Sequence, residues 1–366
     1  MATGAACATE EVWRAQGDRG AGLGDTATLG VASLTARVEA IFRRAGLGPA
    51  QAGAVARVIA AGERDGAKSH GIYRIEGCLR TLKAGHVAPD AVPEVTEDGS
   101  AIVRVEAGRG FAPAAFEAGL PMLAARARAL GLAALVINDC THFSALWPEV
   151  EALAALGLAG LALCPSYSAV APAGGTRPLF GTNPMAFGWP RPGSYPYVFD
   201  FATSVAARGE IELHRRAGTP IPEGWALDEE GKPTTSPERA LAGAMLPFGG
   251  HKGSGLSTMI ELLGGALIGD LTSREALDLL GSTALLPRHG ELILAFDPSR
   301  FAQGRAGDPF ARAEALFAAI VGQGARLPSQ RRLMARARAE AEGITLTAAE
   351  MDQLDRLERL GLDAVA

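Results

Sequence analysis

A histidine and an arginine four residues apart are the first residues of the chain that suggest chemistry. They are His70 and Arg74, in the segment GAKSHGIYR. On a helix this spacing places both side chains on one face, about one turn apart. A guanidinium pairs a carboxylate through two N–H groups, and an imidazole donates a proton near neutral pH. The pair therefore suits a 2-oxo or 2-imino acid as ligand. The spacing alone is equally compatible with two solvated side chains on a helix surface.

Ser69 stands directly before His70 and raises the alternative of a hydrolase. Adjacent side chains on a helix point about 100° apart, so the two groups would not face each other. No GxSxG sequence surrounds Ser69, as a nucleophile elbow would require. We therefore do not expect a nucleophile–base pair at this position.

Two basic segments are candidates for anion binding. Residues 247–259, PFGGHKGSGLSTM, begin a predicted helix after a glycine run, so that backbone N–H groups, His251 and Lys252 would face an anion. This segment predicts a phosphate site. Residues 325–332, ARLPSQRR, add three arginines around a turn, a pattern that alone is typical of a solvated surface.

The segment NDCTHFSALW, residues 138–147, follows a predicted strand at the end where α/β proteins commonly place ligand loops. Cys140 and His142 are too few ligands for a metal, so we expect no metal site and a hydrogen-bonded loop histidine. Thr182 and Asp200 are polar residues in apolar surroundings. Each is therefore expected to make either a structural hydrogen bond or a ligand contact.

Composition and charge exclude several classes of protein. With 48 % apolar residues, the chain of 366 can fill the cores of two domains. Its 35 basic and 40 acidic residues leave no positive field to hold a nucleic acid. The longest apolar run, residues 152–164, is shorter than the ~20 residues that cross a bilayer, so no membrane span is expected. Cys7, Cys78, Cys140 and Cys164 form no CxxC pair and are expected to be reduced thiols of a cytoplasmic protein.

The hydrophobic pattern predicts helices mixed with strands. Leu34, Val38, Ile41 and Phe42 share one face of a first helix, and Pro49 begins a second. Further helices are expected at 114–130, 204–216, 253–269 and beyond 311. Strands are expected at 101–105, 132–138, 158–164, 197–203 and 291–296. The pattern is that of an α/β or α+β protein, and it leaves the strand order open.

Two segments are expected to lack regular structure, namely a flexible extension at residues 1–30 and a surface loop at 219–234. The chain also lacks GxGxxG, because Gly253-Ser254-Gly255 is followed by Leu-Ser-Thr without a third glycine. Walker A and HExxH sequences are not found either. A nucleotide pocket, if the chain has one, is therefore not of the Rossmann type.

Taken together, these segments resemble a known family. GAKSHGIYR, HFSALW, FGTNP, DFATSVAARGE, PIPEGWALD and PFGGHKGSGLS stand in the order found in the malate/L-lactate dehydrogenase family of NAD(P)H enzymes. The resemblance runs from about Ser33 to Arg332. Within the family, HFSALW and the acidic Glu210 look most like the reductases of the cyclic ketimines Δ1-piperideine-2-carboxylate and Δ1-pyrroline-2-carboxylate.

The resemblance implies roles for residues. Ser69, His70 and Glu210 would be catalytic, with His70 the proton donor kept charged by its neighbours, and Arg74 and Thr182 would bind substrate. Glu210 departs from the pattern, since these reductases usually carry Asp there. The implied cofactor contacts are His142, Phe143, Ser144, Ala145, Leu146, Asp200, Phe201, Ala202, His251, Lys252, Arg326, Leu327, Pro328, Ser329, Gln330, Arg331 and Arg332.

The resemblance also implies a non-Rossmann fold, with a large, mainly antiparallel sheet at 126–324 that binds NAD(P)H. A smaller helical domain would comprise residues 31–125 and helices at 325–366, and the protein would be a homodimer. The implied reaction is NADPH-dependent hydride transfer to C2, which yields L-pipecolate or L-proline, with NADH as the alternative cofactor. The rival readings are a dehydrogenase of malate, L-lactate or ureidoglycolate, and a catalytically silent nucleotide-binding subunit.

Overall fold

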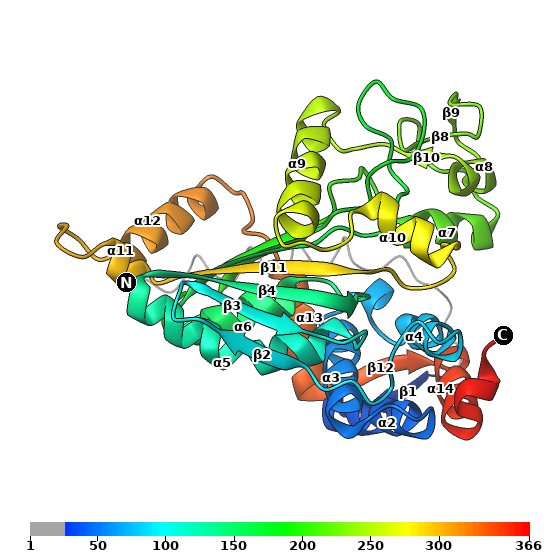
Figure 1. Ribbon diagram of the computed structural model, residues 1–366, viewed down its shortest axis with the longest axis horizontal. Coiled ribbons are helices and arrows are strands. Elements are labelled where there is room, and N and C mark those ends of the chain that lie inside the picture. The colour runs from blue at the N-terminus through cyan, green and yellow to red at the C-terminus, as the bar shows by residue number, and fades with distance from the viewer. Residues whose placement is uncertain (1–25) are drawn as a thin grey trace, which may run out of the picture.

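A seven-stranded sheet runs through the centre of the molecule, as seen in this computed structural model, which describes residues 26–366 (Figure 1). In spatial order the strands are β2 (Glu94–Glu97), β3 (Ile102–Glu106), β4 (Leu132–Thr141), β11 (Arg288–Phe296), β5 (Ala159–Leu163), β6 (Met185–Trp189) and β7 (Tyr197–Phe201). All neighbouring strands are antiparallel except β3 and β4. The expected mainly antiparallel sheet is confirmed.

Helices α5 (Ala112–Leu130) and α6 (Trp147–Ala155) cover one face of this sheet (Figure 1). Their apolar side chains pack against fully buried strand residues such as Leu135 and Ile293. Since successive residues of a strand point to opposite faces, the neighbouring Val136 and Leu292 pack instead on the other side. Both faces of the central strands are therefore buried.

A lobe covers the other face of the sheet (Figure 1). It contains α7 (Arg208–Ala217), β8 (Ala226–Leu227), β9 (Pro233–Thr234), α8 (Pro237–Ala242), β10 (Ala244–Met245), α9 (His251–Glu261), the π-helical turn η2 (Leu262–Ala266) and α10 (Ser273–Leu280). The expected loop at 219–234 is wrong in part, because it holds two strands of a small sheet. Helix α7 begins four residues later than expected because Val205 donates its N–H to the Leu246 carbonyl instead.

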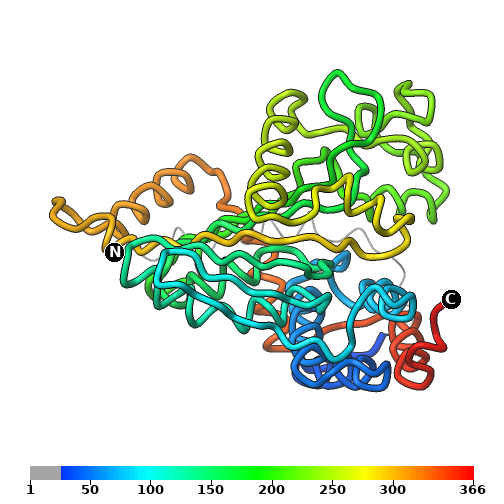
Figure 2. The backbone as a smooth tube through the Cα atoms, viewed as in Figure 1, coloured from blue at the N-terminus to red at the C-terminus, as the bar shows by residue number. Residues whose placement is uncertain are grey.

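The helical domain joins the two ends of the described chain. It comprises β1 (Thr26–Leu29), α2 (Val31–Arg44), α3 (Pro49–Arg64), η1 (Lys68–His70), α4 (Tyr73–Lys83), α13 (Gln330–Glu342), β12 (Ile344–Thr347), α14 (Ala348–Leu360) and η3 (Gly361–Ala364). The face of the first helix is buried as predicted. Figure 2 shows the C-terminal helices beside the N-terminal ones.

Two expected boundaries are wrong. Residues 26–29 are a strand paired with β12 rather than part of a flexible extension, whose residues 1–25 lie outside the described chain. The boundary at 125 falls too late, because β2, β3 and α5 belong to the large sheet and its core. Helices α11 (Pro298–Phe301) and α12 (Pro309–Gly322) form an arm that projects from one end of the sheet (Figure 1). No helix within residues 26–366 is long and apolar enough to span a membrane.

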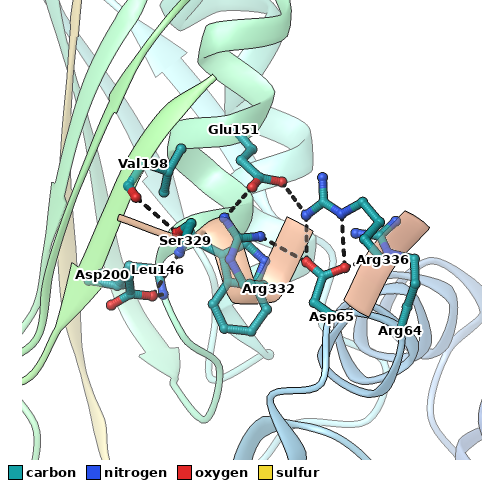
Figure 3. Close-up of polar contacts among 10 residues, drawn as sticks. Arg64, Asp65, Leu146, Glu151, Val198, Asp200, Ser329, Arg332 and Arg336 are labelled. Carbon is teal, nitrogen blue, oxygen red and sulfur yellow. Dashed lines mark hydrogen bonds and ion pairs between the residues drawn. The ribbon is translucent and has the colours of Figure 1, made fainter. Parts of the chain in front are cut away.

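A group of ion pairs ties the helical domain to the sheet domain (Figure 3). Asp65, which follows α3, is buried and accepts from Arg336 Nε at 2.9 Å and from Arg332 Nη1 at 2.8 Å. Arg336 also donates to Glu151 of α6 at 2.7 Å. Burial alone would raise the pKa of Asp65, but the hydrogen bonds from Arg336 and Arg64 outweigh it and lower that pKa. Asp65 is therefore ionised at neutral pH, at the point where α3, α6 and α13 meet.

We predict that Asp65→Ala destabilises the fold by roughly 3 kcal/mol, because buried arginines lose a carboxylate while Glu151 still faces them. Urea unfolding of this variant and of wild type measures the difference. Asp352→Ala is the matched control, since Asp352 is exposed. A loss below about 0.5 kcal/mol, as at an ordinary surface position, would contradict the role given to Asp65.

Candidate active site

The turn η1 is held by a buried carboxylate and two glycines. Glu63 Oε1 accepts the Ile72 N–H at 2.9 Å, and Lys68 Nζ lies 2.6 Å from Glu63 Oε2. A Cβ on Gly71 would stand 2.0 Å from Glu63 Oε1, and one on Gly62 would stand 2.5 Å from the His70 carbonyl oxygen. This close packing fixes the backbone that carries Ser69 and His70.

Ser69, His70 and Arg74 come together at this turn. Ser69 Oγ lies 3.1 Å from His70 Nδ1, and Arg74 Nε donates to the Ser69 carbonyl at 2.7 Å. Our expectation that Ser69 and His70 would not face each other is wrong, because residues 68–70 form a 3₁₀ turn rather than an α-helix. The hydrogen bond to Ser69 leaves Nε2 as the ring nitrogen of His70 for a ligand.

Arg74 supplies the positive charge beside Ser69 and His70. Among residues 26–366, no carboxylate lies within ion-pair distance of the Arg74 guanidinium. Burial lowers the pKa of Arg74 from its usual value. An arginine stays charged in proteins, so this half-buried cation lacks a counter-charge. Burial, and then the charge of Arg74, lower the pKa of His70 to about 3. This lowered pKa disfavours the charged form of His70 that the family resemblance implies, and its role as proton donor stays a prediction.

The loop after β4 packs against the turn η1. The indole of Trp147 meets the His70 ring edge to face, with centroids 6.1 Å apart. Asp200 Oδ2 accepts the N–H groups of Leu146 and Trp147 at 2.8 and 2.9 Å, which caps the first turn of α6. Burial raises the pKa of Asp200 to about 6 despite these bonds. Of the two roles left open for Asp200, the structure shows a structural hydrogen bond.

The turn before α13 meets the same loop (Figure 3). Ser329 adopts a left-handed backbone conformation at φ +63° and donates from Oγ to the Val198 carbonyl at 2.9 Å. The Arg332 guanidinium lies 5.0 Å from the centroid of the Trp147 ring. The segments 142–147, 198–200 and 329–332 therefore meet beside His70. Arg332, expected to contact a cofactor, is engaged here by Asp65 and Glu151.

Thr182 stands before β6, and Glu210 stands in α7. The Thr182 carbonyl accepts the Thr203 N–H at 2.8 Å, which holds the segment before β6. Helix α7 reaches α4, since Arg216 lies 5.8 Å from the Tyr73 ring. Glu210, in the first turn of α7, is exposed and makes no hydrogen bond to His70 within the described chain. Its part in a relay stays a prediction.

The expected phosphate site begins α9. His251 and Lys252 are exposed there, after Gly249 and Gly250 with φ of +58° and +61°. The rings of Phe248 and Phe201 lie 5.7 Å apart, so this turn adjoins the end of β7. The two glycines adopt a conformation that other residues rarely accept. No side chain caps this helix by a hydrogen bond, and the N–H groups of Lys252 and Gly253 donate to the carbonyls of Gly249 and Phe248.

Sequence reasoning missed three buried acidic residues near the site. They are Glu63, Glu149 and Glu291. A glutamate at the start of the apolar run ELILAF was the available signal for Glu291. The expected hydrogen bond of His142 is not shown at its Nε2, which is buried without a hydrogen-bond partner among the described residues.

The comparisons with known proteins agree with this geometry. The sequence pattern of the malate/L-lactate dehydrogenase family matches residues 30–355. The chain belongs to the malate/L-lactate dehydrogenase family. It is 71 % identical over 345 residues to a Δ1-pyrroline-2-carboxylate reductase of Agrobacterium fabrum, covering 94 % of this chain and 100 % of the relative.

Two further relatives carry similar names. A Δ1-pyrroline-2-carboxylate/Δ1-piperideine-2-carboxylate reductase of Pseudomonas aeruginosa is 56 % identical over 306 residues, or 84 % of this chain and 92 % of that one. The crystal structure of a Δ1-piperideine-2-carboxylate reductase from Pseudomonas syringae superposes with a TM-score of 0.87 at 42 % identity, covering 90 % of this chain and 99 % of that one.

As a member of this family the chain is an oxidoreductase that uses a nicotinamide cofactor. The residues present fit such a group. Ser144 Oγ is buried in the loop at 142–146 without a hydrogen-bond partner, and Lys252 is exposed in the first turn of α9. Both features suit a phosphorylated ligand better than an apolar one.

We predict that Gly71→Ala lowers kcat/KM by about 10²-fold, because the added Cβ displaces Glu63 and shifts His70 from its position. Overpacking should also cost about 1–3 kcal/mol of stability in urea unfolding. Gly322→Ala is the control, since a Cβ there meets no atom within 4 Å. Full activity of Gly71→Ala would show that the packing around Glu63 does not position His70.

Proposed function

We propose that this protein reduces the cyclic ketimines Δ1-pyrroline-2-carboxylate and Δ1-piperideine-2-carboxylate to L-proline and L-pipecolate. The observation that carries the proposal is the half-buried Arg74, which has no counter-carboxylate among residues 26–366 and is bonded to the carbonyl of Ser69 beside His70. This pair suits a planar 2-imino or 2-oxo acid. The names of the three relatives above favour the imine over the 2-hydroxy-acid alternative.

Arg74 binds the substrate carboxylate through its terminal nitrogens, because its Nε is already bonded to Ser69. This holds C2 of the substrate at a fixed distance from His70. When bound, the reduced nicotinamide supplies the hydride that reaches C2. His70 Nε2 holds the proton at the adjoining nitrogen, while Ser69 fixes the opposite side of the ring.

Substrate binding changes the net charge around Arg74 and His70. Burial and Arg74 both lower the pKa of His70 in the free protein. Once a carboxylate neutralises Arg74, the second cause is removed, and the pKa of His70 rises. Binding of the substrate therefore makes protonation of His70 less unfavourable, while burial, the larger cause, still lowers its pKa.

NADPH is the cofactor that we propose. Support comes from the exposed Lys252 and Arg331, which add positive charge beyond what a pyrophosphate needs, and His251 is exposed next to Lys252. The homodimer implied by the family resemblance is also a proposal. The exposed Phe301, Leu316 and Val321 on the projecting arm offer an apolar surface to a second copy.

We predict that cyclic ketimines are reduced with kcat/KM at least tenfold above that for pyruvate or oxaloacetate, about 1.4 kcal/mol in transition-state binding. Loss of absorbance of NADPH or NADH with each substrate measures this, and NADPH should give the higher value. If oxaloacetate or pyruvate is the better substrate by tenfold, the dehydrogenase alternative replaces the imine proposal. Equal kcat/KM for the two cofactors would remove only the preference for NADPH.

Variants of Arg74 and His70 should separate binding from proton transfer. Arg74→Lys should raise KM at least tenfold, because an ammonium cannot replace the bidentate guanidinium. His70→Ala should lower kcat by about 10²–10⁴-fold, the usual range for a lost general acid. Steady-state kinetics measures both, and fluorescence titration should show unchanged NADPH binding. Arg359→Lys, on the exposed face of α14, is the control. Nearly full turnover of His70→Ala would exclude His70 as the proton donor.

A further inference from the structure

Unpartnered polar atoms are buried beneath the loop at residues 142–146. This loop leads into α6, and the described structure gives these atoms no hydrogen-bond partner. They are Thr141 Oγ1, His142 Nε2, Ser144 Oγ, Glu149 Oε2 and both carboxyl oxygens of Glu291. Buried polar atoms without partners are rare in native proteins, so such a group requires an explanation.

Glu291 is the centre of this group. It is a β11 residue with 0 % exposure, and its Oε2 lies 3.6 Å from His142 Nε2. The other side of His142 is fixed, because its ring stacks on His289 with centroids 5.6 Å apart. Neither Glu291 Oε2 nor His142 Nε2 has another partner, so each is the available partner of the other.

The surroundings decide the charge of this pair. Glu291 interacts electrostatically with two thiols and a second carboxyl group, and its Oε2 lies near the stacked histidines. These groups are Cys140, Cys164, Glu149, His142 and His289. No lysine or arginine among residues 26–366 forms an ion pair with Glu291. Burial raises the pKa of Glu291 to about 8. Burial and Glu291 raise the pKa of Glu149 as well, while burial, His289 and then His70 and Arg74 lower that of His142.

An ion pair between Glu291 and His142 would need both groups charged in a site that favours neither charge. Desolvation of two ions costs more than their attraction returns unless further hydrogen bonds support them, and here there are none. A neutral carboxyl group and a neutral imidazole satisfy each other without that cost. The carboxyl O–H is then the donor, and the imidazole nitrogen is the acceptor.

We propose that Glu291 is a positioning residue, whose protonated carboxyl group donates a hydrogen bond to His142 Nε2 and so holds the loop at 142–146 in its cofactor-binding conformation. The bond fixes the tautomer of His142, which carries its proton on Nδ1. Glu149 adds a second neutral carboxyl group beneath the same loop. That the loop binds the cofactor rests on the proposed function, whereas the protonation of Glu291 does not.

The protonation of Glu291 is tested on the protein without cofactor. A raised pKa means that the folded state keeps a proton that the unfolded state releases, so wild type loses stability as pH rises from about 4.5 to about 8. Glu291→Gln has no such proton. Its Tm, relative to wild type, should therefore increase between pH 5 and pH 8, whereas the exposed Glu94→Gln should show no such trend.

A Tm of Glu291→Gln that lies below that of wild type by a constant amount from pH 5 to pH 8 would indicate an ion pair and overturn the proposal. If this variant does not fold, the infrared spectrum of wild type decides instead. At pH 7 a buried protonated carboxyl group gives a C=O stretch distinct from that of carboxylates. Absence of this band would equally overturn the proposal.

The effect on the loop is tested by NADPH binding, measured as fluorescence at pH 7. Glu291→Gln, which keeps a donor, should bind within about twofold of wild type, and Glu291→Leu, which has none, should bind about tenfold more weakly. The affinity of wild type should fall above pH 8 and that of Glu291→Gln should not. Equal binding by the Leu variant would overturn the positioning role. Failure of wild type to bind NADPH at all would instead contradict the proposed function.

Discussion

The candidate site depends on a guanidinium that the fold removes from bulk water without providing a carboxylate. Other charged groups at the contact between the domains are paired, as Asp65 is with Arg332 and Arg336. Arg74 differs, because its Nε is bonded to a backbone carbonyl and its terminal nitrogens meet no carboxylate of residues 26–366. A half-buried charge of this kind is unfavourable unless a ligand completes it. Burial, and then this charge, lower the pKa of His70.

The contacts between the domains hold the segment around His70 and Arg74 in place. Asp65 stands five residues before His70 and binds two arginines of α13, one of which lies over the Trp147 ring. Trp147 in turn contacts His70, and its N–H is bonded to Asp200 of β7. One connected set of contacts therefore fixes the helical domain, the loop after β4 and the catalytic turn relative to one another. The carboxylates in this set of contacts stabilise the structure, whereas Arg74 remains available to bind a ligand.

Local sequence patterns predicted many of the helices and five of the seven strands of the central sheet, because apolar spacing reports which face is buried. They could not predict the pairing of β1 with β12, whose residues lie more than 300 positions apart. The segment around His70 was found from its residue types, yet its 3₁₀ geometry depends on Glu63 and on Gly71, which packs against that carboxylate. The sequence pattern did not predict a role for Glu291, because it stands in an apolar strand. Its partners, His142 and Glu149, come from other elements.

The central claim is that Arg74 receives the substrate carboxylate beside His70. A crystal structure of the complex with NADP⁺ and the product L-proline tests it most directly. The account predicts both terminal nitrogens of Arg74 on the proline carboxylate, with the ring nitrogen of proline next to His70. A carboxylate bound by another cation, such as Arg208, with Arg74 still without a partner, would contradict it.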